Sequence, residues 1–392
     1  MEELRRHSKV LVRKGSDLPA MIRACAEEGL HVTVSRGDRV LLKPNLNGID
    51  LVGHQIAVQP QAIAEVVRIL HEAGAREILV AENLERHKPT VELYHESGLD
   101  RLAELPGVKL IGLEKYPYRL AQPPTGLLGQ PFQFSSLALD CDKLISLTNL
   151  KAHHQANFTG ALKNQYTFLS RELKSQFHRG DLECAIVDIN LARKPDYTVV
   201  DGMIAQEGLG PRRGRPVHLG IAMAGSDPVA ADTVACQILG INPAHIRYLN
   251  WATAKGLGCA DEVRIEIDGP PIASLCMPVM TNIDHINAVL EGHAKVVATV
   301  PCSGCIGAAV TALHLAVFRF GKEPSDLSGL TVTVGPLPQE MHGGLVYQVS
   351  HGPEWPDGAG PCQPHQPPTI DAIWDGIARL LRFGQDVGMR HF

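Results

Sequence analysis

Short runs rich in Val, Ile and Leu alternate along the first two thirds of the chain with segments whose apolar residues recur at helical spacing. The runs predict strands, and the helical spacing predicts amphipathic helices. This alternation predicts an α/β fold with a mostly parallel sheet covered by helices, and such sheets place ligands beyond the carboxyl ends of their strands. The predicted strands are residues 40–43, 77–80, 108–111, 143–147, 197–200, 217–222 and 263–267, and the predicted helices are 60–72 and 228–239.

The segment 296–318 contains no Asp, Glu, Lys or Arg and is long enough to cross a membrane. Pro301 and the Ser-Gly pair at 303–304 interrupt it. We therefore expect a buried strand at 295–300, a turn, and a helix from 306 to about 320 in place of one membrane span.

An Asp-Gly-Pro-Pro sequence at 268–271 predicts a domain boundary. We expect an α/β unit over residues 1–270 and a smaller C-terminal α/β unit over residues 271–392. Beyond residue 320, the smaller unit is expected to contain strands at 330–335 and 345–349, a polar loop at 352–368 and a last helix at 369–383.

Composition narrows the class of protein. The chain has 392 residues, 44% apolar and 20% charged, with a net charge of −5, so disorder of the whole chain is excluded and binding to nucleic acid or to an anionic membrane is disfavoured. Its nine cysteines cannot all be paired, and no apolar signal segment is visible near Met1. We therefore expect a reducing, cytoplasmic compartment.

Cationic side chains follow two of the predicted strands. Lys43 begins a Lys-Pro-Asn-Leu sequence, and Lys151, His153 and Lys163 follow the strand at 143–147. Lysines at the ends of parallel strands would hold a small anionic substrate, a carboxylate or a phosphate, and a histidine among them would act as an acid, a base or a ligand.

Two carboxylates follow the predicted strand at 197–200. Asp201 and Glu207 precede Gly208, Gly210 and Pro211, which predict a tight turn close to the ligand. We expect these carboxylates to supply acid–base groups or to bind a divalent cation. For Asp227, in contrast, the sequence favours an N-cap.

Cys302 and Cys305 lie between a predicted strand and the start of a helix, where the helix dipole favours the thiolate form. Cys362 follows about sixty residues later. The three thiols are compatible with an iron–sulfur or zinc site that needs a fourth ligand, whereas Cys302 and Cys305 alone would suffice for a dithiol redox pair. Buried cysteines without a chemical role are the remaining interpretation.

Together these motifs resemble the domain-of-unknown-function 362 family, many members of which carry an iron–sulfur module. The resemblance extends over nearly the whole chain. The sequences that carry it are 43–46, 71–75, Lys151 with His153, 162–164, 200–202, 207–211 and 227–232.

The C-terminal part resembles a cluster-binding extension with a C-x-x-C pair, a strand ending in Cys, and a Gly-Cys-Pro-Pro-like loop. The resemblance implies one iron–sulfur cluster, of the 4Fe–4S type, with Cys302, Cys305 and Cys362 as ligands. Here the strand at 345–349 leads to His351 in place of a cysteine, which implies His351 as the fourth ligand. Cys276, His365 or an open iron position are the alternatives.

The resemblance and the site residues together imply a cluster-dependent oxidoreductase for a small anionic substrate, with a ferredoxin-like electron donor. Three alternatives remain. The first is a lyase or isomerase that uses an open cluster iron or Lys, His and Glu as acids and bases. The second is an electron-transfer or cofactor-delivery protein, and the third is a thiol–disulfide protein that uses Cys302 and Cys305.

Overall fold

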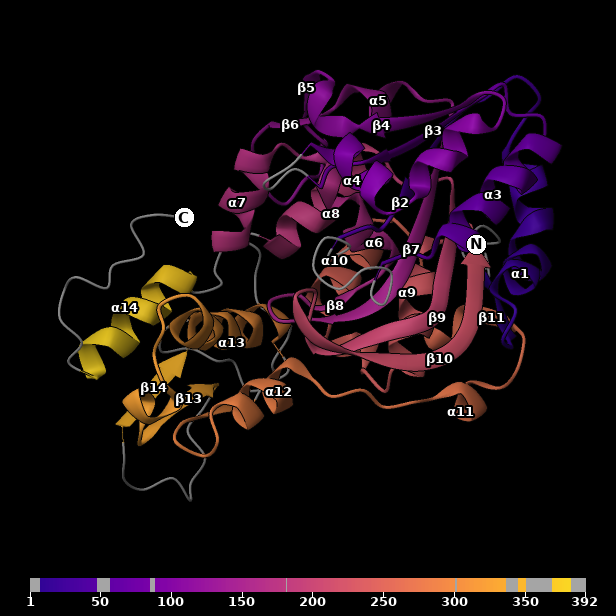
Figure 1. Cartoon of the computed structure of the whole chain (residues 1–392). Coiled ribbons are helices and arrows are strands. Elements are labelled where there is room, and N and C mark those ends of the chain that lie inside the picture. The colour runs from indigo at the N-terminus through magenta and orange to yellow at the C-terminus, as the bar shows by residue number, and fades with distance from the viewer. Residues whose placement is uncertain are drawn as a thin grey trace.

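The computed structural model describes residues 8–47, 57–84, 89–180, 182–299, 302–335, 345–349 and 369–381. Within them, nine strands form one sheet in the order β11-β1-β10-β9-β7-β2-β3-β4, with β8 paired to β7 (Figure 1). The strands are β1 (Ser8–Lys14), β2 (Arg39–Pro44), β3 (Glu77–Glu82), β4 (Val108–Gly112), β7 (Lys143–His153), β8 (Asn157–Thr159), β9 (Tyr197–Leu209), β10 (Arg213–Gly225) and β11 (Ile265–Asp268).

The centre of this sheet is parallel. The neighbouring pairs β4–β3, β3–β2, β2–β7 and β7–β9 all run in the same direction, as does β1–β11. Only β10 against β1 and β9, and β8 against β7, are antiparallel within the described sheet. The predicted α/β fold with a mostly parallel sheet is confirmed.

Helices cover both faces of the sheet. Successive strand residues point to opposite sides, and apolar side chains on both sides are buried under helices. Val40 and Leu42 pack into the core under α1 and α3, while Leu41 packs into the core under α8, α9 and α10. Asp227 accepts hydrogen bonds from the amides of Val229 and Ala230, which confirms it as the N-cap of α9. The helices of this part are α1 (Leu18–Thr33), α3 (Pro60–Glu72), α4 (Thr90–Glu96), α5 (Ser136–Asp140), α6 (Ala161–Asn164), α7 (Arg171–Arg179), α8 (Leu182–Ala192), α9 (Pro228–Ile238), α10 (Arg247–Ala254) and α11 (Ile272–Leu275), and β5 (Tyr118–Ala121) pairs with β6 (Phe132–Ser135).

A second, three-stranded parallel sheet lies near the C-terminus and has its own apolar core. In Figure 1 it lies to one side of the large sheet, below α7. A strand and then a helix occupy 295–318, as predicted, and among the described residues no helix is both long and apolar enough to cross a membrane. The elements are α12 (Asn282–Val289), β12 (Lys295–Ala298), α13 (Ser303–Phe318), β13 (Leu330–Val334), β14 (Leu345–Val349) and α14 (Ile370–Leu380).

Two strands continue well beyond their predicted ends. β7 extends to His153 and β9 to Leu209, so Asp201 and Glu207 lie within a strand and do not follow its end as predicted. The reason is a long antiparallel pairing between β9 and β10, which satisfies the backbone of this segment. Gly208 has φ +77°, and a Cβ there would lie 2.0 Å from His285 Nδ1, so glycine is required where the hairpin meets α12.

Candidate functional site

A cavity of about 470 Å³ lies beyond the carboxyl ends of β2, β3 and β7, which is where the sequence predicted a ligand. Its other walls are α7, the turn between β9 and β10, and the α13 and α14 helices of the C-terminal part. The lining residues are Asn45, Asn47, Glu82, Asn83, Leu84, Lys151, His153, His154, Gln155, Thr159, Lys163, Asn164, Tyr166, Thr167, Arg171, Lys174, Ser175, His178, Arg179, Leu209, Pro211, Arg212, Thr311, His314, Leu315 and Ile370.

The charge of this lining is strongly positive. Six of the described lining residues are Lys or Arg, and Glu82 is the one carboxylate among them. Glu82 already forms an ion pair of 2.7 Å with Lys43. A concave surface with low-dielectric walls concentrates the field of such cations, so the cavity is suited to an anion.

Lys43 lies beneath the cavity and is fully buried. Its Nζ donates to Glu82 at 2.7 Å, to Asn164 Oδ1 at 3.1 Å and to the Pro44 carbonyl at 2.7 Å. Burial lowers the pKa of Lys43 although Glu82 opposes this, and the Lys43 cation holds the pKa of Glu82 below its ordinary value against the effect of burial. This ion pair ties the ends of β2 and β3 to α6.

The other two predicted lysines line the cavity. Lys151 at the end of β7 donates to Asn45 Oδ1 and to the Asn47 carbonyl, both at 3.0 Å. Lys163 on α6 is 7% exposed, and its Nζ lies 5.3 Å from the centre of the Tyr166 ring. Burial lowers the pKa of Lys163 to about 7.

A buried carboxylate fixes the short helix that carries Lys163. Asp232 accepts hydrogen bonds from the amides of Ala161 at 2.6 Å and Leu162 at 3.0 Å, and burial raises its pKa to about 7. A Cβ at Gly160 would lie 2.1 Å from Asp232 Oδ1, so glycine permits this close approach.

Four imidazoles form a row along the cavity wall. His153 and His154 stack at 4.6 Å between ring centres, His154 stacks with His314 at 5.3 Å, and His178 lies 6.3 Å from His153. Burial lowers the pKa of every member: His154 to about 4, His178 and His314 to about 3, and His153 well below its ordinary value. At neutral pH the row is uncharged.

Hydrogen bonds to the backbone set the tautomers of three of these rings. His153 Nδ1 accepts from the amides of Gln155 at 3.0 Å and Ala156 at 3.1 Å, so its proton is on Nε2. His154 Nδ1 donates to the Gly210 carbonyl at 2.8 Å, and His178 Nδ1 donates to the Lys174 carbonyl at 2.7 Å. The wall therefore offers one Nε2–H donor and two Nε2 acceptors.

The predicted carboxylates lie away from this cavity. Asp201 is buried within β9, where it accepts from the amides of Gln59 at 2.8 Å and Met203 at 3.1 Å, and burial raises its pKa to about 6. Glu207 accepts from the Met280 amide at 2.9 Å. The continuation of β9 separates both side chains from the lysines and histidines with which the sequence grouped them.

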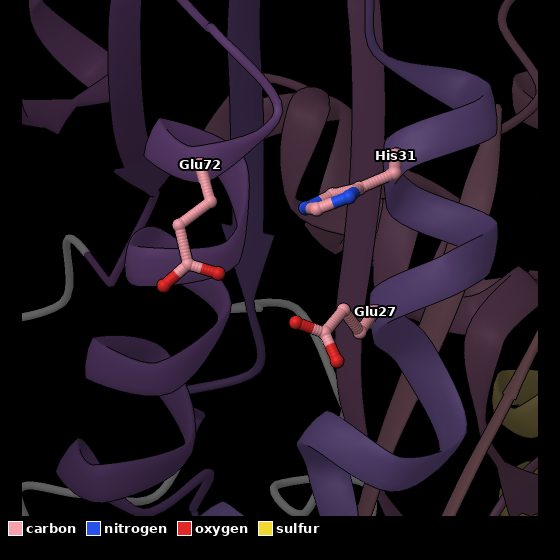
Figure 2. Close-up of side chains that lie close together, drawn as sticks. All are labelled: Glu27, His31 and Glu72. Atoms are coloured by element: carbon pink, nitrogen blue, oxygen red, sulfur yellow. The ribbon is translucent and has the colours of Figure 1, made fainter.

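A group of three potential metal-binding side chains lies outside the cavity lining, between α1 and α3 (Figure 2). Glu27, His31 and Glu72 are the members. Arg23 already forms ion pairs of 2.7 Å with Glu27 and with Glu72, and both carboxylates are well exposed. These charges are thus compensated without a metal, and we assign no cation to the group.

Cys302 and Cys305 begin α13, and their Sγ atoms lie 2.7 Å apart. Both are buried, and Ser303 between them donates to Glu183 at 2.6 Å. No third Cys, His, Asp or Glu of the described residues forms a ligand group with this pair, and that includes the exposed Cys276. The other predicted ligands, Cys362, His351 and His365, lie outside the described residues.

Several residues of the cavity were absent from the sequence prediction. Arg171, Lys174 and His178 share one face of α7, and their spacing of three and four residues is a signal that could have identified them. Arg212 on the hairpin turn and His314 on α13 carry no such signal, because tertiary packing alone brings them to the cavity.

The chain is similar in sequence or in fold to several known proteins. Over 246 residues it is 28% identical to a thylakoid-associated protein of Synechocystis sp. (strain ATCC 27184 / PCC 6803 / Kazusa). The match covers 58% of this chain and 71% of that protein. Two solved structures are similar at low TM-scores. The lactate racemase apoprotein from Thermoanaerobacterium thermosaccharolyticum is 12% identical with a TM-score of 0.39, over 85% of this chain and 70% of that chain. A protein from Thermotoga maritima is 14% identical with a TM-score of 0.38, over 82% and 72%.

A family profile confirms the resemblance drawn from the motifs over residues 40–237, whereas the resemblance of the C-terminal part to a cluster-binding extension stays a prediction. The profile described as Domain of unknown function (DUF362) matches residues 40–237, which is half of the chain. These residues include β2, β7, α6 and α7, and hence most of the cavity wall. The chain belongs to the DUF362 family.

Proposed function

We propose that this protein is an enzyme that binds a small anionic substrate, a carboxylate or a phosphate, in the cavity and moves a proton on it. The observation that carries the proposal is the lining itself, whose described residues include six Lys or Arg side chains and a single carboxylate that is already paired. This corresponds to the lyase or isomerase alternative that uses side chains as acids and bases.

The proton-transfer groups are the neutral imidazoles and Lys163. A lysine whose pKa is about 7 exists in both protonation states near neutral pH, so it both gives and takes a proton efficiently. His153 offers a donor, and His154 and His178 offer acceptors. Such groups typically accelerate a reaction by about 10²–10⁴-fold.

Anion binding is tested by calorimetric titration with inorganic phosphate and with malonate. Replacing Arg171 and Lys174 together by Glu reverses the charge of one wall, and we expect binding to weaken at least about tenfold, since two attractive charges become repulsive. The matched control is Gln176→Glu, which adds a negative charge to α7 away from the lining. Equal affinities in the two variants would contradict the proposal.

Proton transfer is tested separately by incubating the protein with lactate, malate and alanine in deuterated water. Enzymatic exchange of the hydrogen next to the carboxylate is expected for at least one of them and is followed by NMR. Lys163→Met should abolish the exchange, whereas phosphate should still bind through Arg171 and Lys174, although more weakly than to the wild type. Exchange that persists in Lys163→Met would remove Lys163 from the proposed chemistry.

For the cofactor, we propose that Cys302, Cys305, Cys362 and His351 hold one 4Fe–4S cluster. Support comes from two buried thiols side by side at the start of a helix, which is a donor type that iron–sulfur clusters use. When bound, the cluster would supply one-electron transfer from a ferredoxin-like donor, which is the oxidoreductase alternative to the proton transfer proposed above.

Anaerobic purification with iron and sulfide counts and an absorption spectrum tests the cluster. Cys362→Ala and His351→Ala should change the spectrum, whereas Cys276→Ala should not. A colourless, metal-free protein with a disulfide between Cys302 and Cys305 would overturn the cluster. It would favour the thiol–disulfide function instead, which the 2.7 Å between the two sulfurs supports.

A further inference from the structure

The three buried lysines near the cavity have different surroundings. Lys43 is paired with Glu82, and Lys151 donates to two oxygen atoms of the β2 end. Among the described residues, no carboxylate or carbonyl accepts a hydrogen bond from Lys163, whose Nζ lies over the face of Tyr166. Lys163 is therefore the lysine of this group that lines the cavity and donates to no carboxylate, amide or carbonyl oxygen of the described residues.

The neighbours of Lys163 are uncharged or cationic. Lys163 lines the same cavity as His153, His154 and His178. Its positive charge contributes to lowering the pKa of all three rings. Burial without an anionic partner favours the neutral amine, and a neutral buried amine is a nucleophile. The site thus combines a nucleophilic nitrogen with a positively charged wall.

We propose that Lys163 forms an imine with the carbonyl group of a small anionic aldehyde or ketone held in this cavity. The inference rests on the proposed anion-binding function and names the substrate class. The Nζ lone pair attacks the carbonyl carbon, and the carbonyl oxygen is protonated as the C–N bond forms. The carbinolamine then loses water, which carries away both hydrogens of the amine, so that amine and carbonyl give imine and water.

The imine explains how the site would ease proton removal. Once protonated, the imine withdraws electrons from the carbon next to the former carbonyl carbon and acidifies the hydrogen on that neighbouring carbon. The Nε2 atoms of His154 and His178 are acceptors on the same wall. The carboxylate or phosphate of the substrate would lie against Arg171 and Lys174 on α7.

Trapping by reduction tests this inference. The protein is incubated with pyruvate or with glycolaldehyde phosphate and reduced with sodium cyanoborohydride, and the adduct is located by peptide mass spectrometry. We expect one adduct at Lys163, formed faster as pH rises through about 7 because the neutral amine increases. Because an aldehyde forms imines faster than a ketone, the labelling rate at Lys163 is divided by the rate of the same probe with free lysine. The larger ratio identifies whether the wall prefers carboxylate or phosphate.

The controls separate a site-specific imine from general lysine labelling. Lys163→Arg should lose the adduct, while Lys109→Arg, at an exposed lysine paired with Glu77, should keep it. Dihydroxyacetone, a ketone without charge, should label Lys163 at least about tenfold more slowly than the charged ketone pyruvate does. Labelling that is equal in Lys163→Arg, or equal with the uncharged ketone, would overturn the inference.

The result is also distinguishable from failure of the proposed function. Calorimetric binding of phosphate by a protein that gives no adduct at Lys163 would overturn the imine alone. Absence of phosphate, malonate and pyruvate binding would overturn the anion site itself. Circular dichroism of Lys163→Arg and of Lys163→Gln checks that each variant is folded before either conclusion is drawn.

Discussion

At the scale of single residues, the lysines divide into structural and chemical ones according to their partners. Lys43 and Glu82 are 0% and 1% exposed and 2.7 Å apart, so each compensates a charge that the interior would otherwise not tolerate. Lys163 has no such partner among the described residues, and its charge is instead available to a ligand. Residue type and position after a strand are similar for both, and only the three-dimensional partners distinguish them.

The buried pair leads to a stability prediction. Lys43→Met leaves the Glu82 carboxylate buried and unpaired, and we expect the free energy of unfolding to fall by about 3–5 kcal/mol. Combining it with Glu82→Gln should recover part of this loss. The measurement is urea denaturation, with Lys109→Met as control, since its exposed pair with Glu77 is worth at most about 1 kcal/mol. Similar losses of unfolding free energy in Lys43→Met and Lys109→Met would show that the buried pair stabilises the fold no more than the exposed pair does.

At the scale of elements, the short helix α6 depends on a distant carboxylate. Asp232 on α9 accepts the first two amides of α6, which would otherwise be buried without acceptors. Asp232→Ala should therefore lower the free energy of unfolding by about 1–3 kcal/mol and weaken phosphate binding through displacement of Lys163. Asp227→Ala removes the N-cap of the same helix α9 and serves as the control. Asp227→Ala should lower the free energy of unfolding by about 1 kcal/mol and leave phosphate affinity unchanged.

The elements also show how far the sequence predicts this fold. Strands with β-branched runs and helices with apolar stripes were identified because local spacing encodes them. The end of β9 was not identified from the sequence. Pairing with β10 keeps the segment after Val200 extended, and local spacing does not encode that pairing. For the same reason Asp201 and Glu207 were grouped with the lysines, whereas the strand carries them away from the cavity.

At the scale of the whole molecule, the cavity is built between two parts of the chain with separate apolar cores. Lys151, His153 and Lys163 come from the large sheet and α6, whereas His314 comes from α13, more than a hundred residues later. Leu209 at the end of β9 packs into the C-terminal core and joins the two parts. Sequence patterns predict each part, but the contact between them determines which side chains meet.

The row of neutral imidazoles couples the stability of the whole molecule to pH. The folded pKa of His178 is about 3, and the unfolded value is about 6.5, so below pH 6.5 the unfolded chain binds a proton that the folded chain excludes. Its contribution to stability is therefore lost progressively as pH falls from 6.5 toward 3. Asp201 and Asp232 act with the opposite sign, because burial raises their pKa values to about 6 and 7.

Because these effects partly cancel in the wild type, the prediction concerns a difference between proteins. Between pH 7.5 and pH 5, His178→Asn should lose less stability than the wild type, by about 1–2 kcal/mol. Urea denaturation at several pH values measures this, with His245→Gln, at an exposed histidine, as the control that should follow the wild type. If both variants keep the pH dependence of the wild type, the His178 ring does not exclude a proton in the folded protein, and the row is not neutral as a unit.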